Sequence, residues 1–387
     1  PDGDLAAFCD VLTEFIKLEA RAQRNQHMNQ ILRPLEERVI DERCLAELRS
    51  DGEFEPDIRT FRFTCDGKFG NTARFREGDR LRLHRGDYQQ GFDVMLTSES
   101  DSGVDIRPET RKADLSIALK DSPAGWLLDE SFFDAEKLLL KGLEAAVASQ
   151  DGRDRVLALF AGCAQQEIDF GFDDFSDGEA YAEAAGLNES QGCALESAVN
   201  AKHCHLIQGP PGTGKTYVLA QTVATLVERG ERVLLTAFTH RAIHHALRVC
   251  DRVIRDPERI AKIGVYVYDP TLAPIRQFET WAKSPLKHKH GGLLVGTTPY
   301  SAASQRMGGA QFDTVVIDES SQMTIPLAIL AMLKGRKFIF FGDHRQLPPV
   351  LQSIPKREAA SWSVFGGLAR QAEVTTLKTT YRLNAEL

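Results

Sequence analysis

The chain has 387 residues, enough for two or three domains with a separate hydrophobic core in each. Its formal net charge is −8, which excludes a basic field over the whole molecule, so any contact with nucleic acid must come from a local patch. Seven cysteines without a Cys-x-x-Cys pair, no signal peptide and no apolar segment of bilayer length exclude a disulfide scaffold and a membrane protein, and indicate an intracellular location, cytoplasmic or nuclear.

Apolar residues recur at helical spacing over the first part of the chain, which predicts a helical region over residues 1–55. The repeat contains Leu5, Phe8, Leu12, Phe15, Ile16, Ile31, Leu35, Val39, Leu45 and Leu48. Pro34 interrupts it, and a proline inside a helix removes a hydrogen bond and clashes with the preceding turn. We therefore expect two helices between Asp4 and Leu48, separated or kinked near Pro34.

After residue 55 the period of the apolar pattern changes to two, as in strands with one buried face. The alternating sets are Phe61 and Phe63, Leu81 and Leu83, Val94 and Leu96, and then Leu115, Ile117 and Leu119. Gly78-Asp79 and Gly86-Asp87 are suitable turn residues between them. The pattern predicts a small antiparallel β-barrel over residues 56–128.

One part of the predicted barrel is rich in arginine. Its basic residues, which alternate with apolar ones, are Arg74, Arg76, Arg80 and Arg82. A basic face over an apolar one is ordinary for a half-buried strand. Four arginines without a lysine are equally typical of binding to a nucleic-acid backbone, so both interpretations stay open, with Arg80 and Arg82 as the candidate contacts.

Helical spacing returns from Asp134 to Ala148 and from Arg153 to Cys163. An acidic, glycine-containing stretch follows from Glu167 to Glu183, and it is more typical of a solvated linker than of an interaction tail. We expect helices and an acidic linker over residues 129–186.

From residue 187 onward, short apolar strands are predicted to alternate with helices. The strand candidates are Leu206-Ile207, Val233 to Leu235, Leu293 to Val295, Val315 to Ile317, Phe338 to Phe341 and Val374 to Leu377. Most of them are apolar throughout, as expected of parallel strands covered by helices on both faces. Residues 187–387 thus predict an α/β domain with a doubly wound parallel sheet.

The strongest motif of the chain lies after the first of these strands. Its residues are Gly209, Pro210, Pro211, Gly212, Thr213, Gly214, Lys215 and Thr216, which match G-x-x-x-x-G-K-[ST]. The backbone N–H groups of such a loop surround the phosphates of a nucleotide, the lysine reaches the β- and γ-phosphates, and the threonine hydroxyl binds Mg²⁺. A helical pattern from Tyr217 to Glu228 follows, so its N-terminus adds to the phosphate site.

A second motif supplies carboxylates. The apolar run from Thr314 to Ile317 ends in Asp318-Glu319, as a central parallel strand would when it delivers acids to the C-terminal edge of a sheet. Paired with the phosphate loop, Asp318 is the expected Mg²⁺ ligand and Glu319 the residue that polarises the attacking water. We expect ATP and Mg²⁺ as cofactors.

Four further segments occur in an informative order around these motifs. They are Leu187 to Gln191, Thr236 to Ala242, Gly342 to Pro349 and Thr379 to Asn384. With the phosphate loop and Asp318-Glu319-Ser320-Ser321-Gln322, they resemble superfamily 1 helicases of subfamily B, the branch containing the nonsense-decay helicase and the replication nuclease-helicase. The resemblance is specific over residues 187–387 as a first RecA-like domain. Upstream it is architectural, since that branch carries a small barrel flanked by stalk helices.

The resemblance implies roles in nucleotide binding and hydrolysis at the matching positions. Gln191 would read the adenine edge and Tyr381 would stack on the base, while Lys215 and Glu319 keep the roles given above. Gln346 would sense the γ-phosphate. Arg382 would contact that phosphate where charge builds in the transition state.

The resemblance also implies contacts to the backbone of a single strand. The matching positions are Thr239, His240, Thr297 and Thr298. One motif departs from the family, whose Asp-Glu-Ala-x-Gln is Asp-Glu-Ser-Ser-Gln here, a small-for-small change that we expect to be harmless.

The leading hypothesis is an ATP-dependent helicase or translocase that acts on single-stranded DNA or RNA, with 5′→3′ polarity implied by the resemblance and DNA slightly favoured by Thr239-His240. A P-loop ATPase that remodels protein partners, and a nucleotide-binding fragment without motor activity, stay as alternatives. The chain begins at Pro1 and stops in mid-pattern at Leu387, so we expect a fragment that lacks the second RecA-like domain. Such a fragment should bind ATP but hydrolyse it poorly.

Overall fold

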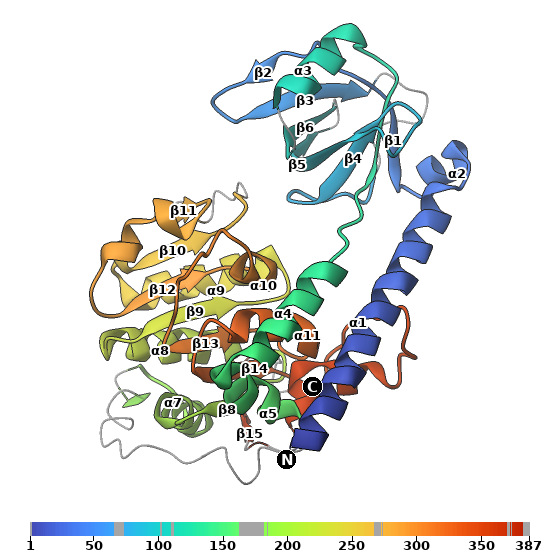
Figure 1. The fold of residues 1–387 in the computed structure, drawn as a ribbon. Helices are drawn as coiled ribbons and strands as arrows, with labels where there is room; N and C mark the ends of the chain where they lie inside the picture. The colour runs from blue at the N-terminus through green and yellow to red at the C-terminus, as the bar shows by residue number, and fades with distance from the viewer. Residues whose placement is uncertain are drawn as a thin grey trace. The chain divides into compact units, whose positions relative to one another are not determined.

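The computed structural model divides into two compact units (Figure 1). One unit contains Pro1–Glu19 and Ala135–Leu387, and the other contains Ala20–Asp134. The structure describes residues 2–65, 73–100, 103–109, 112–161, 182–183, 185–266, 272, 274–369, 372 and 374–381. Most of the predicted acidic linker, and Arg382, lie outside these residues.

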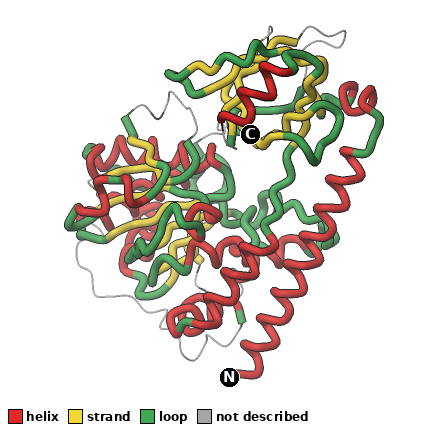
Figure 2. The backbone as a smooth tube through the Cα atoms, turned by 45° about the horizontal axis from the view of Figure 1, so that its top comes forward, coloured by secondary structure: helices red, strands yellow, loops and turns green. Residues whose placement is uncertain are grey.

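The first element is the helix α1, Asp2–Ile31, which is continuous over 30 residues (Figure 2). The break predicted at Pro34 is confirmed, because the short helix α2, Leu35–Ile40, starts directly after this proline. Among the described residues, no helix is both long enough and apolar enough to cross a membrane.

The predicted continuation of the second helix to Leu48 is wrong, since Cys44–Arg49 forms strand β1. The pairing of β1 with a neighbouring strand shifts register between Leu45 and Leu48, and Glu47 between them has a left-handed backbone with φ of 55°. This bulge turns both leucines into the barrel core although they are three residues apart. A bulged strand therefore produced an apolar spacing that resembles a helix.

Six strands in the described part of the barrel unit close into an antiparallel barrel in the order β1-β7-β4-β5-β6-β3, with β1 paired to β3. After β1 the strands are β3 (Thr60–Cys65), β4 (Arg80–His84), β5 (Phe92–Ser100), β6 (Gly103–Pro108) and β7 (Trp126–Glu130), and β2 (Phe54–Glu55) extends the β3 edge. The predicted inward pairs, such as Phe61 and Phe63 or Leu81 and Leu83, are fully buried in its core.

One expected barrel strand is instead the helix α3, Lys112–Asp121. Leu115 and Leu119 are buried at helical i, i+4 spacing, whereas Ile117 is 61% exposed. Three apolar residues at i, i+2 and i+4 fit either period, and here only the burial of the outer two separates helix from strand.

The helical segments predicted after the barrel are present. The first is α4 (Glu136–Ala148). The second starts as a π-helical segment, η1 (Gly152–Leu157), and continues directly as α5 (Ala158–Phe160). Both belong to the unit formed by Pro1–Glu19 and Ala135–Leu387, where Leu143, Leu157 and Phe160 are part of one hydrophobic core.

That unit contains a parallel sheet of eight strands in its described part, ordered β11-β10-β12-β9-β13-β14-β8-β15. All of the predicted strands are present, as β8 (Cys204–Gln208), β9 (Arg232–Thr236), β12 (Leu293–Gly296), β13 (Thr314–Ile317), β14 (Lys337–Gly342) and β15 (Val374–Thr376). The strands β10 (Ile260–Ile263) and β11 (Arg276–Phe278) were not predicted.

Helices cover both faces of this sheet, so successive strand residues enter different cores. Leu206 packs in one core and Ile207 in the other, and the same alternation occurs at Val315 and Val316. One face is covered by α4, α10 (Pro299–Ala303), α11 (Ile325–Met332) and α12 (Val364–Leu368), and the other by α7 (Glu189–Asn200), α8 (Lys215–Glu228) and α9 (His240–Ile254). The predicted doubly wound α/β class is confirmed.

Candidate nucleotide-binding site

The phosphate loop connects the carboxyl end of β8 to the first turn of α8, as the sequence predicted. Gly212 and Gly214 have φ of 83° and 79°, left-handed values that favour glycine. A side chain is excluded at Gly209, where an added Cβ would lie 2.8 Å from the Lys215 Cβ. These glycines let the backbone curl around the space in front of the N-terminus of α8.

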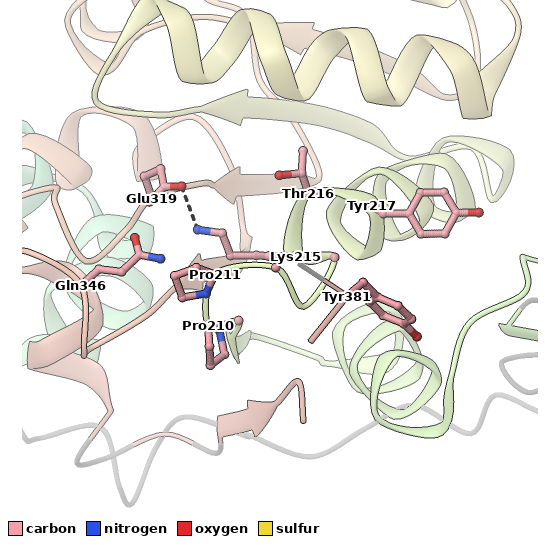
Figure 3. Close-up of a pocket in the computed structure, with 11 residues that line it drawn as sticks. Pro210, Pro211, Lys215, Thr216, Tyr217, Glu319, Gln346 and Tyr381 are labelled. Carbon is pink, nitrogen blue, oxygen red and sulfur yellow. Dashed lines mark hydrogen bonds and ion pairs between the residues drawn. The ribbon is translucent and has the colours of Figure 1, made fainter. Parts of the chain in front are cut away.

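A cleft of about 730 Å³ opens over this loop (Figure 3). It is lined by Gly209, Pro210, Pro211, Gly212, Gly214, Lys215, Thr216, Tyr217, Glu319, Gln346 and Tyr381. Most of the predicted nucleotide-binding residues are therefore brought together in one cavity. Thr213 and Gln191 are buried and do not line it, and Asp318, which is 3% exposed, does not line it either.

Lys215 is the electrostatic centre of the cleft. Its Nζ lies 2.9 Å from Glu319 Oε1 and 3.6 Å from Asp318 Oδ1, and its side chain is 9% exposed. Burial lowers the pKa of Lys215, but the two carboxylates outweigh this and raise it. Burial raises the pKa of Asp318, and the adjacent Glu319 adds to that shift while Lys215 opposes it. Lys215 thus stays charged, and its ammonium group offsets the repulsion between the two adjacent carboxylates.

Glu319 occupies an unusual backbone conformation, with φ of 51°. Its N–H donates to the Asp318 carboxylate over 2.9 Å, and its Oε2 is buried without a hydrogen-bond partner among the described residues. A left-handed non-glycine residue costs roughly 1–3 kcal/mol and is found mainly where function requires it. The strained backbone places the Glu319 side chain in the cleft while Asp318 stays buried beside it.

The donor set beside the loop suits a magnesium ion. Mg²⁺ in such proteins takes one or two carboxylates and completes its shell with phosphate oxygens and water. Asp318 and the Thr216 hydroxyl provide oxygen ligands next to the phosphate loop, and the adjacent Glu319 Oε2, which has unused acceptor capacity within the described part of the chain, can accept a hydrogen bond from a water of the ion. The residues present therefore fit the ion.

Two serines of the acid motif join it to the Gln346 loop, and one of them, Ser320, is the small-for-small change that we expected to be harmless. Ser320 Oγ donates to the Phe341 carbonyl over 2.8 Å, and Ser321 Oγ accepts from the Asp343 N–H over 2.6 Å. Gly342 lies between them, where an added Cβ would come within 2.7 Å of both hydroxyls. The loop after β13 and the loop after β14 are thereby fastened to each other.

The far end of the Gln346 loop is held by α1, a contact that the sequence did not predict. The buried Glu19 carboxylate accepts from the N–H groups of Gln352 and Ser353 and from the Ser353 hydroxyl, over 2.7–3.0 Å. Gln346 therefore lies between two anchored points of one loop. No motif signals this contact, since it joins residues 334 positions apart.

We expect Ser321→Ala to lower the free energy of unfolding by about 1–3 kcal/mol, because the buried Asp343 N–H would lose its acceptor. Ser361→Ala is the matched control, since that hydroxyl donates to the Glu358 carbonyl at an exposed position. Chemical denaturation of both variants measures the difference. Equal stability of Ser321→Ala and the wild type would contradict the fastening of the two loops.

The Gln191 side chain is hydrogen-bonded behind the phosphate loop. Its Nε2 donates to the Thr213 carbonyl over 3.0 Å, and its Oε1 accepts from the Asn188 N–H over 3.1 Å, which completes a capping box at the start of α7. The structure thus gives Gln191 a supporting contact to the phosphate loop, and adenine reading by its amide stays a prediction.

Tyr381 and Tyr217 form the other end of the cleft. The Tyr381 N–H donates to the Gly212 carbonyl over 2.7 Å, and its hydroxyl accepts from Asn188 Nδ2 over 2.7 Å. Tyr217, which follows the phosphate loop directly, donates its hydroxyl to the Ala185 carbonyl over 2.9 Å. Tyr217 was not among the predicted site residues, although an aromatic residue in the first turn after such a loop was a usable signal.

The four residues predicted to contact single-stranded nucleic acid follow the adjacent β-strands β9 and β12, at the carboxyl edge of the sheet. Thr239 caps α9 by accepting from the Ala242 N–H, with His240 next to it, and Thr298 caps α10 through the Ser301 N–H. Thr297 is fully buried, and its hydroxyl donates to the Ile263 carbonyl over 2.7 Å. The role of these four residues stays a prediction.

The arginines of the barrel do not share one strand. Arg80 and Arg82 lie on β4, whereas Arg74 and Arg76 precede it in a loop. The turn predicted near Gly78-Asp79 is present, closed by the Asp79 N–H that donates to the Arg76 carbonyl, and it separates Arg74 and Arg76 from β4.

Both candidate arginines on β4 are engaged by acids. Arg80 Nε lies 3.1 Å from Glu109 Oε2, and the Arg80 side chain is 40% exposed. Arg82 is 18% exposed, pairs with Asp93 over 3.0 Å and donates to the carbonyls of Tyr88 and Gln89. Arg80 is the more accessible of the two, whereas Arg82 holds a barrel loop.

We expect the charge reversal Arg80→Glu to weaken binding to single-stranded DNA and to reduce the slope of log K against log salt by about 1, without altering sequence preference. Arg82→Glu should in addition destabilise the barrel, because it removes the donor to two carbonyls. Fluorescence anisotropy over a salt series, with thermal melts, separates these effects. The charge-matched control is Lys120→Glu at an exposed position of α3. An unchanged affinity of Arg80→Glu for single-stranded DNA would contradict a nucleic-acid contact by Arg80.

Comparison with known proteins matches residues 191–352 to a family described as an AAA domain. The DNA replication ATP-dependent helicase/nuclease dna2 of Schizosaccharomyces pombe is 33% identical over 208 residues, which cover 52% of this chain and 15% of that protein. The Saccharomyces cerevisiae DNA2 protein is 32% identical over 181 residues (44% and 11%), and the Homo sapiens one is 28% identical over 215 residues (52% and 20%). The chain thus spans a fifth or less of these relatives.

Among solved structures, an Arterivirus nonstructural protein 10 helicase matches with a TM-score of 0.41 and 13% identity, covering 92% of this chain and 58% of that one. This likeness is too low for a conclusion. The ordered motifs of the cleft and the identity to the helicase/nucleases are more specific. Over about half of its length, the chain is therefore similar to the DNA replication helicase/nucleases, and its motifs resemble those of superfamily 1 helicases.

Proposed function

We propose that residues 187–387 are the ATP-hydrolysing part of a helicase or translocase that moves on single-stranded nucleic acid. The observation that supports this most is the convergence of Lys215, Glu319 and Gln346, from three separate motifs, on one cleft over a phosphate loop. A cleft that only bound nucleotide would need the first of these residues but not the other two.

The residues divide the work of hydrolysis between them. Lys215 would exchange its carboxylate partners for the β- and γ-phosphates when ATP enters the loop. The released Glu319 carboxylate would then accept a proton from a water whose oxygen attacks the γ-phosphorus, as the bond to the β-phosphate oxygen breaks and ADP leaves. Gln346, on the loop fastened through Ser321, would respond to the loss of the γ-phosphate.

Thr216 and Asp318 would hold the Mg²⁺ ion. Bound there, the ion would neutralise phosphate charge and stabilise the negative charge of the transition state. Asp318 is suited to this task because it is buried, hydrogen-bonded to the Glu319 N–H and next to Lys215 of the loop.

The polymer is proposed to be DNA in preference to RNA, with movement 5′→3′, in a nuclear or cytoplasmic setting. The relatives are named for DNA replication, and Thr239-His240 resembles the replication branch. The strand would pass over the carboxyl edge of the sheet, where the residues after β9 and β12 lie on neighbouring strands.

The test is steady-state ATPase activity with single-stranded DNA, with single-stranded RNA, with duplex and without polymer. We expect stimulation by single strands, larger with DNA than with RNA. Gln346→Ala should keep ATP binding and lose the stimulation, whereas Gln311→Ala, an exposed glutamine outside the cleft, should behave as the wild type.

Each outcome selects a function. Activity that is independent of any polymer would contradict the motor proposal and favour an ATPase that remodels proteins. Equal stimulation of the ATPase activity by RNA and by DNA would contradict only the proposed preference for DNA.

A further inference from the structure

The cleft has two chemically different ends. Lys215 points toward Glu319, with Gln346 on the same side, while Tyr217 and Tyr381 lie on the other side of the loop (Figure 3). Lys215 and Tyr217 are two residues apart in the first turn of α8, so their side chains leave the helix about 200° apart. One end of the cleft is ionic and the other is aromatic.

A triphosphate bound on the loop has only one orientation that suits both ends. Its terminal phosphate belongs beside Lys215, Glu319 and Gln346, which are the charged and amide groups of the cleft. The nucleoside must then lie at the end that contains the two tyrosines. This step rests on the proposed function.

Both tyrosine rings are presented to that end and fixed in place. Tyr217 is 40% exposed and Tyr381 is 64% exposed. The hydroxyl of each ring is hydrogen-bonded to the same short segment before α7, to the Ala185 carbonyl and to Asn188 Nδ2 respectively. An exposed ring held at its far edge loses little further freedom when a flat ligand packs on it.

From this arrangement we infer that Tyr217 is a second aromatic contact for the nucleobase, in addition to Tyr381. Neither ring offers a charged group to a base, so the contact is stacking, which tolerates any base and strengthens with its ring area. The site should therefore prefer purine over pyrimidine nucleotides, with little discrimination between adenine and guanine from Tyr217 itself.

The segment from Ala185 to Asn188 gains a role in this scheme. It holds both rings through their hydroxyls, and Asn188 also caps α7 with its side chain, which accepts from the Gln191 N–H over 3.0 Å. The base-binding end is thereby built from α7, α8 and the residues after β15.

The experiment measures dissociation constants of ATP, CTP and inorganic tripolyphosphate by calorimetry. Tripolyphosphate reports the phosphate end and lacks a base. We expect Tyr217→Ala to weaken ATP binding about tenfold or more, to weaken CTP binding less and to leave tripolyphosphate binding unchanged. Tyr217→Phe, which keeps the ring, should bind ATP within about threefold of the wild type, and Tyr266→Ala, a 43% exposed tyrosine outside the cleft, should bind as the wild type.

Unchanged ATP affinity in Tyr217→Ala would overturn the inference. An equal loss for ATP and tripolyphosphate would also overturn it, because the ring would then only support the loop. Retained tripolyphosphate affinity shows that a variant is folded at this site. A wild-type protein that binds neither ligand would overturn the proposed function itself, and this inference with it.

Discussion

Lys215→Ala should reduce ATP hydrolysis by roughly 100-fold or more, which corresponds to about 2.7 kcal/mol of transition-state stabilisation. The ammonium is the only lysine or arginine group lining the cleft among the described residues, and it is held 2.9 Å from Glu319. Without it, the loop loses the charge that binds the terminal phosphates. Steady-state ATPase assays measure the effect.

The control must separate lost chemistry from lost folding. Asp318 and Glu319 would be left without their shared cation, so some loss of stability is also expected. A thermal melt of Lys215→Ala, next to the variant Lys141→Ala at an exposed position of α4, measures that loss. A well-folded Lys215→Ala with wild-type turnover would refute the assignment of the cleft.

Glu319→Gln should retain binding of Mg·ATP and lose hydrolysis by about 10²–10⁴-fold. The amide has nearly the shape of the carboxylate but cannot take a proton from the attacking water. Because the glutamine also relieves Lys215 of one carboxylate, we expect ATP affinity to be equal to the wild type or tighter. Binding assays and single-turnover hydrolysis distinguish the two effects.

The adjacent acid provides the comparison. Asp318→Ala should weaken binding that depends on Mg²⁺, and Asp318→Asn should do so while keeping an acceptor for the Glu319 N–H. Reduced Mg²⁺-dependent affinity in both Asp318 variants, but not in Glu319→Gln, supports the division of roles. If all three variants bind Mg·ATP equally badly, the roles of the two acids are wrong.

The amino-acid sequence by itself determined the phosphate loop, the acid pair and most of the parallel strands. In each case the information is local. Gly212 and Gly214 are needed where φ is positive, and runs such as Val315 to Ile317 are apolar throughout because helices bury both faces of their sheet. Short-range signals of this kind are readable without knowing what lies across the sheet.

Tertiary structure alone decided which element two of the apolar patterns form. A bulge placed Leu45 and Leu48 on one strand face, and packing made Leu115 and Leu119 a helix face. Both spacings were compatible with the other element, because two or three apolar residues do not fix a period. The neighbours that bury them come from distant parts of the chain.

Tertiary structure also decided how the cleft is supported. The contacts of Tyr217 with Ala185 and of Ser321 with Asp343 join segments that no local pattern relates. Such pairings depend on which loops meet at the carboxyl edge of the sheet. These loops come into contact only when the strands have paired in their final order, because the hydrogen bonds of β14 with β13 and β8 bring the loops together.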